Sequence, residues 1–291
     1  MTNPQGPAQK LRARLKTTEI VTAPGVYDHM SMRIAQRAGF DTLYASGYWN
    51  AASALGEPDV GIAGATDFVG IFRRYVEKSG ASIIADADTG FGSLTNLDRA
   101  VKSYQHAKIA AIQLEDQGFP KICGHVGRAS SVSTEEMVRR VRVAVEARGE
   151  GDILIIARTD ARRSEGLDAA LARLSAYAGA GADILFLEAP ENEEEISRAA
   201  HILPKPLLLN AAHGGVTPIL SPARYQELGA RLVIYPAGAP LSAAYAARAF
   251  YTALAQGDAN IAHENMFDFD DMSEMMGMSE VIEFQERHGQ P

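Results

Sequence analysis

Short apolar runs alternate with amphipathic stretches along most of the chain. The runs are rich in Ile, Leu and Val, and several show little alternation with polar residues. This pattern is typical of parallel strands that are buried on both faces. The runs that we expect to form strands are 19–25, 41–47, 81–88, 110–116, 152–159, 183–190, 205–210 and 231–238.

The stretches between these runs have the period of an α-helix. Helices are predicted over 27–38, 134–148, 167–179 and 240–256. The clearest apolar faces are formed by Met30, Ile34 and Ala38 in the first helix and by Met137, Val141 and Val145 in the second. Eight strands alternating with helices predict an α/β fold of the (β/α)₈ barrel (TIM barrel) type. An open doubly wound sheet is the alternative, but no G-x-G-x-x-G motif follows any predicted strand.

No low-complexity linker divides the chain, so we expect residues 1–291 to form a single barrel domain. Residues 258–291 remain after the eighth unit and form a C-terminal helical extension rich in Met and Phe. A closed barrel leaves no core for these side chains. The extension therefore packs either on the flank of its own barrel or on a neighbouring subunit.

Composition narrows the range of functions. The chain has 28 Lys and Arg against 36 Asp and Glu, a formal net charge of −8, which disfavours nucleic acid and anionic membranes as partners. One cysteine allows no intrachain disulfide, the first residues contain no apolar h-region, and no run of 18 apolar residues occurs. We therefore expect a soluble cytoplasmic protein.

Polar residues gather where the predicted strands end. In a barrel these carboxyl ends form one rim, which is where active sites lie. The residues concerned are Ser46, Gly47, Asp86, Asp88, Glu115, Asp116, Arg158, Asp160, Glu188 and Asn210. Because so many polar residues converge on one rim, they are poorly explained as solvent-exposed surface residues without a function.

Asp86 and Asp88 are two residues apart on an extended strand, so both carboxylates point to the same side. Glu115 at the end of the next strand can join them directly or through water. Clustered carboxylates favour a hard cation such as Mg²⁺, with Mn²⁺ as a second choice. Alternatively, Asp88 caps the loop that begins at Thr89.

The loop after the fourth strand is long, polar and rich in glycine, and it holds the only cysteine, Cys123. Lys121 and His125 flank this thiol and would favour its thiolate form. Such a loop is typical of a segment that covers an active site. Buried cysteines that only fill space usually lie within apolar runs, unlike this one.

Arg158 ends a strand of the buried type and therefore needs an anionic partner. That partner is either a protein carboxylate such as Glu188 or a carboxylate of the substrate. A metal site on the same rim favours the substrate. His213, which follows the seventh strand, is a further candidate.

The chain resembles the isocitrate lyase/phosphoenolpyruvate mutase superfamily over nearly its whole length. The motifs that carry the resemblance are PGVYDHMSMRIAQRAGFDTLYASG, GEPDVG, DADTGFG, QLEDQGFPKICGH, ARTDA, LEAP and LNAAHGGVTP. The resemblance implies a barrel whose C-terminal helix is exchanged between subunits of a homotetramer, and a small dicarboxylate as substrate. It also implies roles for individual residues: Cys123, Lys121, His125, Tyr44 and Glu188 as catalytic residues, Ser46, Gly47, Tyr48, Asp59, Gly124, Arg158 and Asn210 as substrate-binding residues, and Asp86, Asp88 and Glu115 as the Mg²⁺ site.

Within this superfamily the K-x-CGH motif marks the lyases that cleave a carbon–carbon bond, with the cysteine as general acid. The resemblance therefore implies a lyase acting on a 2-hydroxy dicarboxylate of the 2-alkylmalate, dimethylmalate or methylisocitrate kind. The alternatives are an oxaloacetate hydrolase or decarboxylase, a phosphonopyruvate-type enzyme, or a non-catalytic carboxylate-binding protein. His213 and Val216 depart from the dimethylmalate lyase-like pattern near the substrate's side group. We expect Mg²⁺ and Arg158 to make this small site locally positive.

Overall fold

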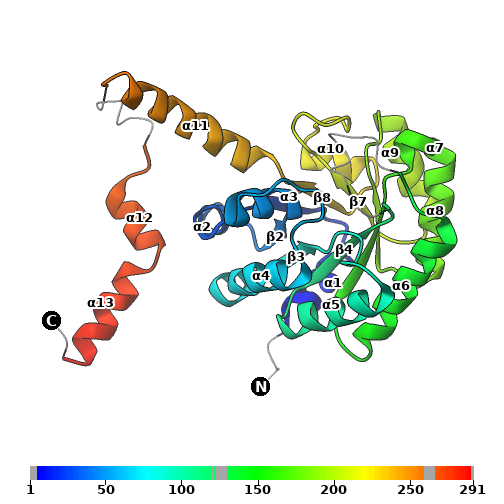
Figure 1. Cartoon of the computed structure of the whole chain (residues 1–291), viewed down its shortest axis with the longest axis horizontal. Helices are drawn as coiled ribbons and strands as arrows, with labels where there is room; N and C mark the ends of the chain where they lie inside the picture. Colours follow the sequence, from blue (N-terminus) through cyan, green and yellow to red (C-terminus); the bar gives the residue numbers. More distant parts are fainter. Residues whose placement is uncertain (1–4, 119–120, 122–129, 259–265, 290–291) are drawn as a thin grey trace.

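Eight parallel strands close into a barrel in the computed structural model (Figure 1). The structure describes residues 5–118, 121, 130–258 and 266–289. The strands follow one another around the barrel in chain order, and β1 pairs with β8, Val21 lying opposite Leu232. The prediction of a (β/α)₈ barrel is therefore confirmed, and the doubly wound alternative is wrong.

All eight predicted strands form; seven lie within the predicted ranges, and β1 extends one residue beyond its range. They are β1 (Val21–Val26), β2 (Thr42–Ala45), β3 (Ser82–Asp86), β4 (Ala111–Glu115), β5 (Leu154–Thr159), β6 (Ile184–Leu187), β7 (Leu207–Asn210) and β8 (Leu232–Tyr235). The helical elements are α1 (Pro7–Arg14), α2 (His29–Arg37), α3 (Gly47–Asn50), the π-helix η1 (Ala51–Leu55), α4 (Ala65–Ser79), α5 (Leu94–His106), α6 (Thr134–Arg148), α7 (Arg162–Glu165), α8 (Leu167–Gly179), α9 (Glu193–Ile202), α10 (Pro222–Glu227), α11 (Gly238–Ala255), α12 (Phe269–Met275) and α13 (Met278–Arg287).

The apolar core has two layers. Alternate strand residues such as Ile156 and Phe186 fill the barrel interior, and Leu11 of α1 packs with them. The other strand faces pack against the surrounding helices, where Met137 and Val141 of α6 are fully buried as predicted. Burial on both faces explains why the strands read as continuous apolar runs.

The helices begin and end at residues that satisfy their free backbone groups. The Asp28 carboxylate accepts a hydrogen bond from the Ser31 amide at the start of α2, and Ser133 caps α6 in the same way. Gly80 ends α4 with a left-handed backbone (φ 64°). Because all eight strands are parallel, every βα loop lies at the same end of the barrel.

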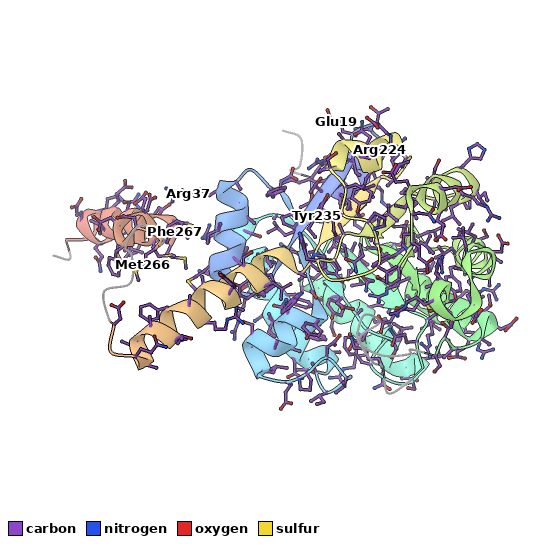
Figure 2. All side chains as sticks on the ribbon, turned by 90° about the horizontal axis from the view of Figure 1, so that it is seen from above. Glu19, Arg37, Arg224, Tyr235, Met266 and Phe267 are labelled. Atoms are coloured by element: carbon purple, nitrogen blue, oxygen red, sulfur yellow. The ribbon has the colours of Figure 1, made fainter. Side chains whose placement is uncertain are left out.

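Helix α2 departs from the sequence prediction. Met30 and Ile34, expected on its buried face, are 49% and 43% exposed, whereas Met32 is fully buried. The periodicity identifies an apolar face but not what covers it. Figure 2 shows this helix beside the C-terminal segment, and the Arg37 guanidinium lies 3.1 Å from the Asp271 carboxylate of α12.

Helix α11 also departs from prediction, because it does not pack on the barrel as an eighth outer helix. It projects away from the barrel together with α12 and α13 (Figure 1), and these three helices are called the arm below. Pro240, near its start, is the buried residue of α11, while Tyr245 and Tyr251 are about two-thirds exposed. The chain thus leaves the barrel at α11, and the arm includes α11 as well as helices of the predicted extension. No helix in the described ranges is long and apolar enough to cross a membrane.

Candidate active site

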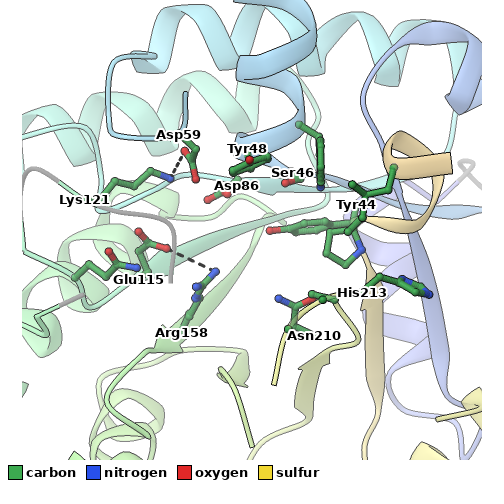
Figure 3. A pocket seen from close by; sticks show the side chains of 18 residues that line it. Tyr44, Ser46, Tyr48, Asp59, Asp86, Glu115, Lys121, Arg158, Asn210 and His213 are labelled. Carbon is green, nitrogen blue, oxygen red and sulfur yellow. Dashed lines mark ion pairs between the residues drawn. The ribbon is translucent and has the colours of Figure 1, made fainter. Parts of the chain in front are cut away.

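A cavity of about 220 Å³ opens at the carboxyl ends of the barrel strands (Figure 3). Its charged and polar lining residues are Tyr44, Ser46, Tyr48, Asp59, Asp86, Glu115, Gln117, Lys121, Arg158, Asn210 and His213. Trp49, Pro236 and Leu241 contribute an apolar part of the wall. The convergence predicted from the strand ends is thus what the barrel produces.

Asp86 occupies the end of β3 and is buried. Its Oδ2 accepts a hydrogen bond from the Gly47 amide (3.1 Å), and its Oδ1 accepts one from the Asp88 amide (3.0 Å). A Cβ atom at position 47 would lie 2.8 Å from Oδ2, so only glycine lets the backbone approach this closely. Asp88 itself has a left-handed backbone (φ 48°), a conformation that costs energy and is common at functional sites.

Lys121 is buried between two carboxylates. Its Nζ lies 2.7 Å from Asp59 Oδ1 and 2.5 Å from Asp88 Oδ1, and the residue is 3% exposed. Burial opposes its charge, but the surrounding carboxylates hold the pKa of the Lys121 ammonium well above its usual range. Lys121 is therefore a permanent cation, suited to bind an anion and not to accept a proton.

Arg158 is held by protein groups on several sides. Its Nε and Nη2 donate to the two oxygens of Asp160 (2.9 and 2.8 Å), and its guanidinium lies over the Phe186 ring at 5.2 Å. Nη1 lies 3.7 Å from Glu115 Oε2. Asp160 thus supplies the anionic partner that the sequence left open, and two of the three guanidinium nitrogens are committed to it.

The Tyr44 hydroxyl donates a hydrogen bond to Gln113 Oε1 (3.0 Å) beneath the cavity. Burial, followed by the nearby Asp86 charge, raises the pKa of Tyr44 well above its usual value. The phenol therefore stays protonated and can act only through hydrogen bonds.

Glu188 lies behind the cavity wall. Its carboxylate accepts from the Asn210 amide (3.2 Å) and lies 3.5 Å from Arg158 Nη2. In this arrangement Glu188 touches two residues that line the cavity without lining it itself.

The site is rich in negative charge. Its buried carboxylates are Asp59, Asp86, Asp88, Glu115, Asp160 and Glu188, and in the described ranges they face only the cations Lys121 and Arg158. Burial, offset in part by Lys121, raises the pKa of Asp88 to about 7, and burial raises the pKa of Glu115 well above its usual range. The six carboxylates outnumber these two cations, so a locally positive site remains an expectation that depends on a bound divalent cation.

This charge pattern fits a divalent cation. Glu115 Oε1 is buried without a hydrogen-bond partner in the described part of the chain, and Asp86 lines the cavity beside it. Within the same ranges, no three acidic, His or Cys side chains converge closely enough to hold an ion by themselves. Mg²⁺ commonly binds through one or two carboxylates and keeps several waters. Asp86, Asp88 and Glu115, together with water, would hold such an ion.

The other predicted residues are placed differently by the structure. Cys123, Gly124 and His125 lie outside the described residues. His213 lines the cavity, whereas Val216 is 39% exposed and lies outside the lining. Asp160 lies at the rim as predicted, but its pairing with Arg158 was not predicted, and Gln113 was not predicted as a site residue. The pairing could have been found, since Asp160 lies two residues after Arg158 and so on the same side of the extended chain.

Comparison with known proteins identifies the family. The sequence pattern of the phosphoenolpyruvate phosphomutase family matches residues 11–255. The chain belongs to the phosphoenolpyruvate mutase/isocitrate lyase superfamily. Among its relatives in this superfamily, 2,3-dimethylmalate lyase from Eubacterium barkeri is 42% identical over 97% of this chain and 98% of its own length. A 2-methylisocitrate lyase from Aeropyrum pernix is 41% identical over 79% of this chain and 74% of its own.

Solved structures of superfamily members superpose along almost the entire chain. Oxaloacetate acetylhydrolase in complex with 3,3-difluorooxalacetate has a TM-score of 0.92 at 34% identity and covers 98% of both chains. Phosphonopyruvate hydrolase in complex with oxalate and Mg²⁺ has a TM-score of 0.87 at 26% identity, over 98% of this chain and 100% of the other. The barrel and the arm thus recur among superfamily enzymes with different reactions.

Proposed function

We propose that this protein is a Mg²⁺-dependent lyase that cleaves the C2–C3 bond of a 2-alkylmalate, with 2,3-dimethylmalate as the first candidate and methylisocitrate as the second. One observation carries the proposal: buried carboxylates that suit Mg²⁺ share a small cavity with Lys121 and Arg158, cations that suit a dicarboxylate. The close relationship to 2,3-dimethylmalate lyase supports the same reaction.

The wall of the cavity supports an alkylmalate over a larger tricarboxylate. Lys121 and Arg158 both lie on the side of the acidic residues, whereas Trp49, Pro236 and Leu241 line the cavity with apolar surface. Alkyl groups are stabilised on such a surface because they leave water. Lys121 and Arg158 suit two substrate carboxylates. For a third carboxylate, the remaining basic side chain in the described lining is His213.

In this proposal each group of the chain has a defined task. Arg158, fixed by Asp160, binds one substrate carboxylate, and the permanently charged Lys121 stabilises negative charge that develops on the substrate. Tyr44, which stays protonated, orients the 2-hydroxyl. Mg²⁺ held by Asp86, Asp88 and Glu115 would stabilise the oxyanion charge that forms at C2.

The bond changes balance without a further reactant. The 2-hydroxyl gives its proton to a carboxylate of the site, C2 becomes a carbonyl carbon, and the C2–C3 electron pair moves to C3 and its carboxylate. The Cys123 thiol then protonates C3 as general acid, aided by its neighbours Lys121 and His125 in the sequence. The products are a 2-oxo acid and a carboxylate.

Oxaloacetate hydrolysis is the second candidate function. It is favoured by the close superposition with oxaloacetate acetylhydrolase. Its products, oxalate and acetate, differ from those of a lyase, so product analysis separates the two candidates.

The proposal is tested with a substrate panel in excess Mg²⁺. We expect 2-oxo acid release from 2,3-dimethylmalate or another 2-alkylmalate to exceed release from methylisocitrate, isocitrate and malate. Cys123→Ser should lose cleavage by about 10²–10⁴-fold while substrate binding survives. Near wild-type cleavage by this variant would refute the general acid, activity in EDTA would refute the metal, and oxalate from oxaloacetate alone would favour the hydrolase.

We also propose that the arm packs on a second copy of this chain in a homotetramer. Its exposed apolar side chains include Leu254, Phe269 (83% exposed) and Phe284, and the apolar face of α2 that carries Met30 and Ile34 is likewise uncovered in the single chain. Burying these faces against each other would remove a large apolar surface from water. Deletion of residues 258–291 should shift the sedimentation profile to smaller species; an unchanged profile would refute the exchange.

A further inference from the structure

Asp116 is the most deeply buried carboxylate near the site, yet it does not line the cavity. It is 0% exposed and directly follows Glu115 at the end of β4. Burial raises its pKa despite hydrogen bonds that favour its charged form. Burying a charged carboxylate lowers stability unless hydrogen bonds or ion pairs compensate for the lost water, so the contacts of Asp116 show why it is buried here.

Three hydrogen bonds fix the Asp116 carboxylate. Its Oδ1 accepts from the Asp160 amide (3.0 Å), and its Oδ2 accepts from the Thr159 hydroxyl (2.6 Å) and the Tyr177 hydroxyl (2.8 Å). Tyr177 belongs to α8, so the carboxylate joins the end of β5 to an outer helix.

Arg173 of α8 reinforces this junction. Its Nη1 lies 3.6 Å from Asp116 Oδ2, and its Nε and Nη2 donate to Glu165 (2.9 and 2.7 Å). The same Nη1 donates to the Val132 carbonyl (2.8 Å), while the Val132 amide donates to the Asp116 carbonyl (2.7 Å). Asp116 is thus held by rigid elements on several sides and is a fixed point for the β5 terminus.

Asp160 connects this fixed point to the cavity. Its amide is held by Asp116, and its carboxylate forms the two-pronged contact with Arg158. The Arg158 fork is planar, so its direction is set by the position of Asp160. We propose that Asp116 is a positioning residue that acts through Asp160 to aim Arg158 at a substrate carboxylate.

The inference rests on the proposed function only in using Arg158 as a carboxylate ligand. Oxalate, a dicarboxylate without a bond to cleave in this reaction, is therefore a suitable probe. Its binding in excess MgCl₂ is measured by calorimetry on the full chain, with thermal unfolding of every variant measured alongside.

Asp116→Ala should weaken oxalate binding by about 10- to 100-fold, the usual effect of removing a supporting partner of a ligand-binding group. Asp116→Asn should retain most of the affinity. Its Oδ1 can still accept from the Asp160 amide, and its NH₂ group can donate to the Thr159 and Tyr177 hydroxyls. If only the negative charge of Asp116 mattered, Asp116→Asn would lose as much oxalate affinity as Asp116→Ala.

The matched control is Asp183→Ala at the opposite end of the barrel. Asp183 accepts from a β5 amide, that of Ile155 (2.9 Å), and from Arg148 (2.6 Å), so its removal costs similar contacts far from the cavity. This variant should unfold at a lower temperature but bind oxalate with unchanged affinity.

A double-variant cycle tests the route. If Asp116 acts through Asp160, the double variant of Asp116→Ala and Asp160→Asn should bind oxalate no more weakly than the weaker single variant. Additive losses would overturn the route. Should Asp116→Ala not fold, Tyr177→Phe removes one donor to the same carboxylate and should weaken oxalate binding in the same direction by a smaller factor.

Two outcomes overturn different statements. Wild-type affinity in Asp116→Ala, with thermal destabilisation like that of Asp183→Ala, would refute the positioning role and leave the proposed function intact. Failure of the wild-type chain to bind oxalate would instead refute the carboxylate site of the proposed function, on which this inference rests.

Discussion

The carboxylates at the two ends of the barrel differ in how fully cations compensate their charge. At the amino end of β6, Asp183 accepts hydrogen bonds from Arg12 (2.9 Å), Arg148 (2.6 Å) and the Ile155 amide (2.9 Å). At the carboxyl ends of β3 and β4, Asp86, Asp88 and Glu115 are buried, and the cations beside them are Lys121 and Arg158.

The difference separates a stabilising end from a functional end. Asp183 has a cation for each oxygen, so its charge is compensated inside the folded chain. The carboxylates at the cavity are undercompensated, and burial raises the pKa of Asp88 and of Glu115. These carboxylates therefore lower the stability of the ligand-free protein, and their charges become useful only when a cation and a substrate bind.

Within this comparison, the largest effect is expected from neutralising Glu115. Glu115→Gln should lower turnover by about 10²–10³-fold, because it removes a charge that supports the metal and faces Arg158. The same change should raise the unfolding temperature of the metal-free protein, since the raised pKa of Glu115 means that its charge opposes folding. Turnover is measured on the active substrate of the panel, and unfolding by calorimetry in EDTA.

Glu135→Gln is the matched control, because Glu135 lies in the first turn of α6, away from the cavity. It should change neither turnover nor the response to EDTA. A less stable metal-free Glu115→Gln protein would contradict the view that the cavity carboxylates oppose folding.

A second effect, of a few degrees in unfolding temperature, is expected from Asp88→Asn as a function of pH. Below about pH 4 the carboxyl is protonated in both the folded and the unfolded chain, so it contributes no difference. Between about pH 4 and pH 7 the unfolded chain loses this proton while the folded chain keeps it, so the wild type loses stability as the pH rises. Above about pH 7 the loss is complete.

The advantage of metal-free Asp88→Asn over the wild type should therefore grow from pH 4 to about pH 7 and then level off. Thermal unfolding in EDTA across this range measures it. Mg²⁺ should reduce the advantage, because a bound cation stabilises the charged carboxylate and thereby the wild-type fold. An advantage that shrinks as the pH rises would contradict the raised pKa of Asp88.

The sequence predicted the barrel and most of the cavity because both depend on local patterns. Apolar runs locate strands, and in a parallel barrel the residue that ends a strand must lie at the mouth, as Asp86 and Arg158 do. Contacts between distant loops leave no such pattern. The Lys121–Asp59 pair joins residues that are 62 positions apart, and no local sequence pattern in either segment predicts this contact.

The direction of the arm was not predictable for a different physical reason. Helical periodicity in α2 and in α11 marks apolar faces, but a face can be buried in its own chain or in another copy with the same gain in free energy. Met30, Ile34 and Tyr245 are exposed in the single chain although the pattern places them on helices that should be covered.

A third effect is expected at the stabilising end of the barrel. Asp183→Asn removes the charge that compensates Arg148 and turns one acceptor oxygen into a donor, so it should lower the free energy of unfolding by about 1–3 kcal/mol. Neither KM nor kcat should change, because Asp183 lies at the end of the barrel opposite the cavity. Denaturant unfolding and steady-state kinetics check the two statements. A changed KM would mean that the two ends of the barrel are coupled.

The smallest effect is expected from Arg12→Ala at the same end. The Arg12 side chain is 41% exposed, so solvent screens its pairing with Asp183, whereas Arg148 is only 17% exposed and keeps its 2.6 Å contact. Removal of Arg12 should therefore cost no more than about 1 kcal/mol of unfolding free energy.

The matched variant Arg148→Ala should cost more, because it uncovers Asp183 Oδ2 and also removes a donor at 3.5 Å from the Ile153 carbonyl. Denaturant unfolding of the two variants side by side measures the difference. Equal losses would show that compensation at this end depends on the number of cations near Asp183 and not on their burial.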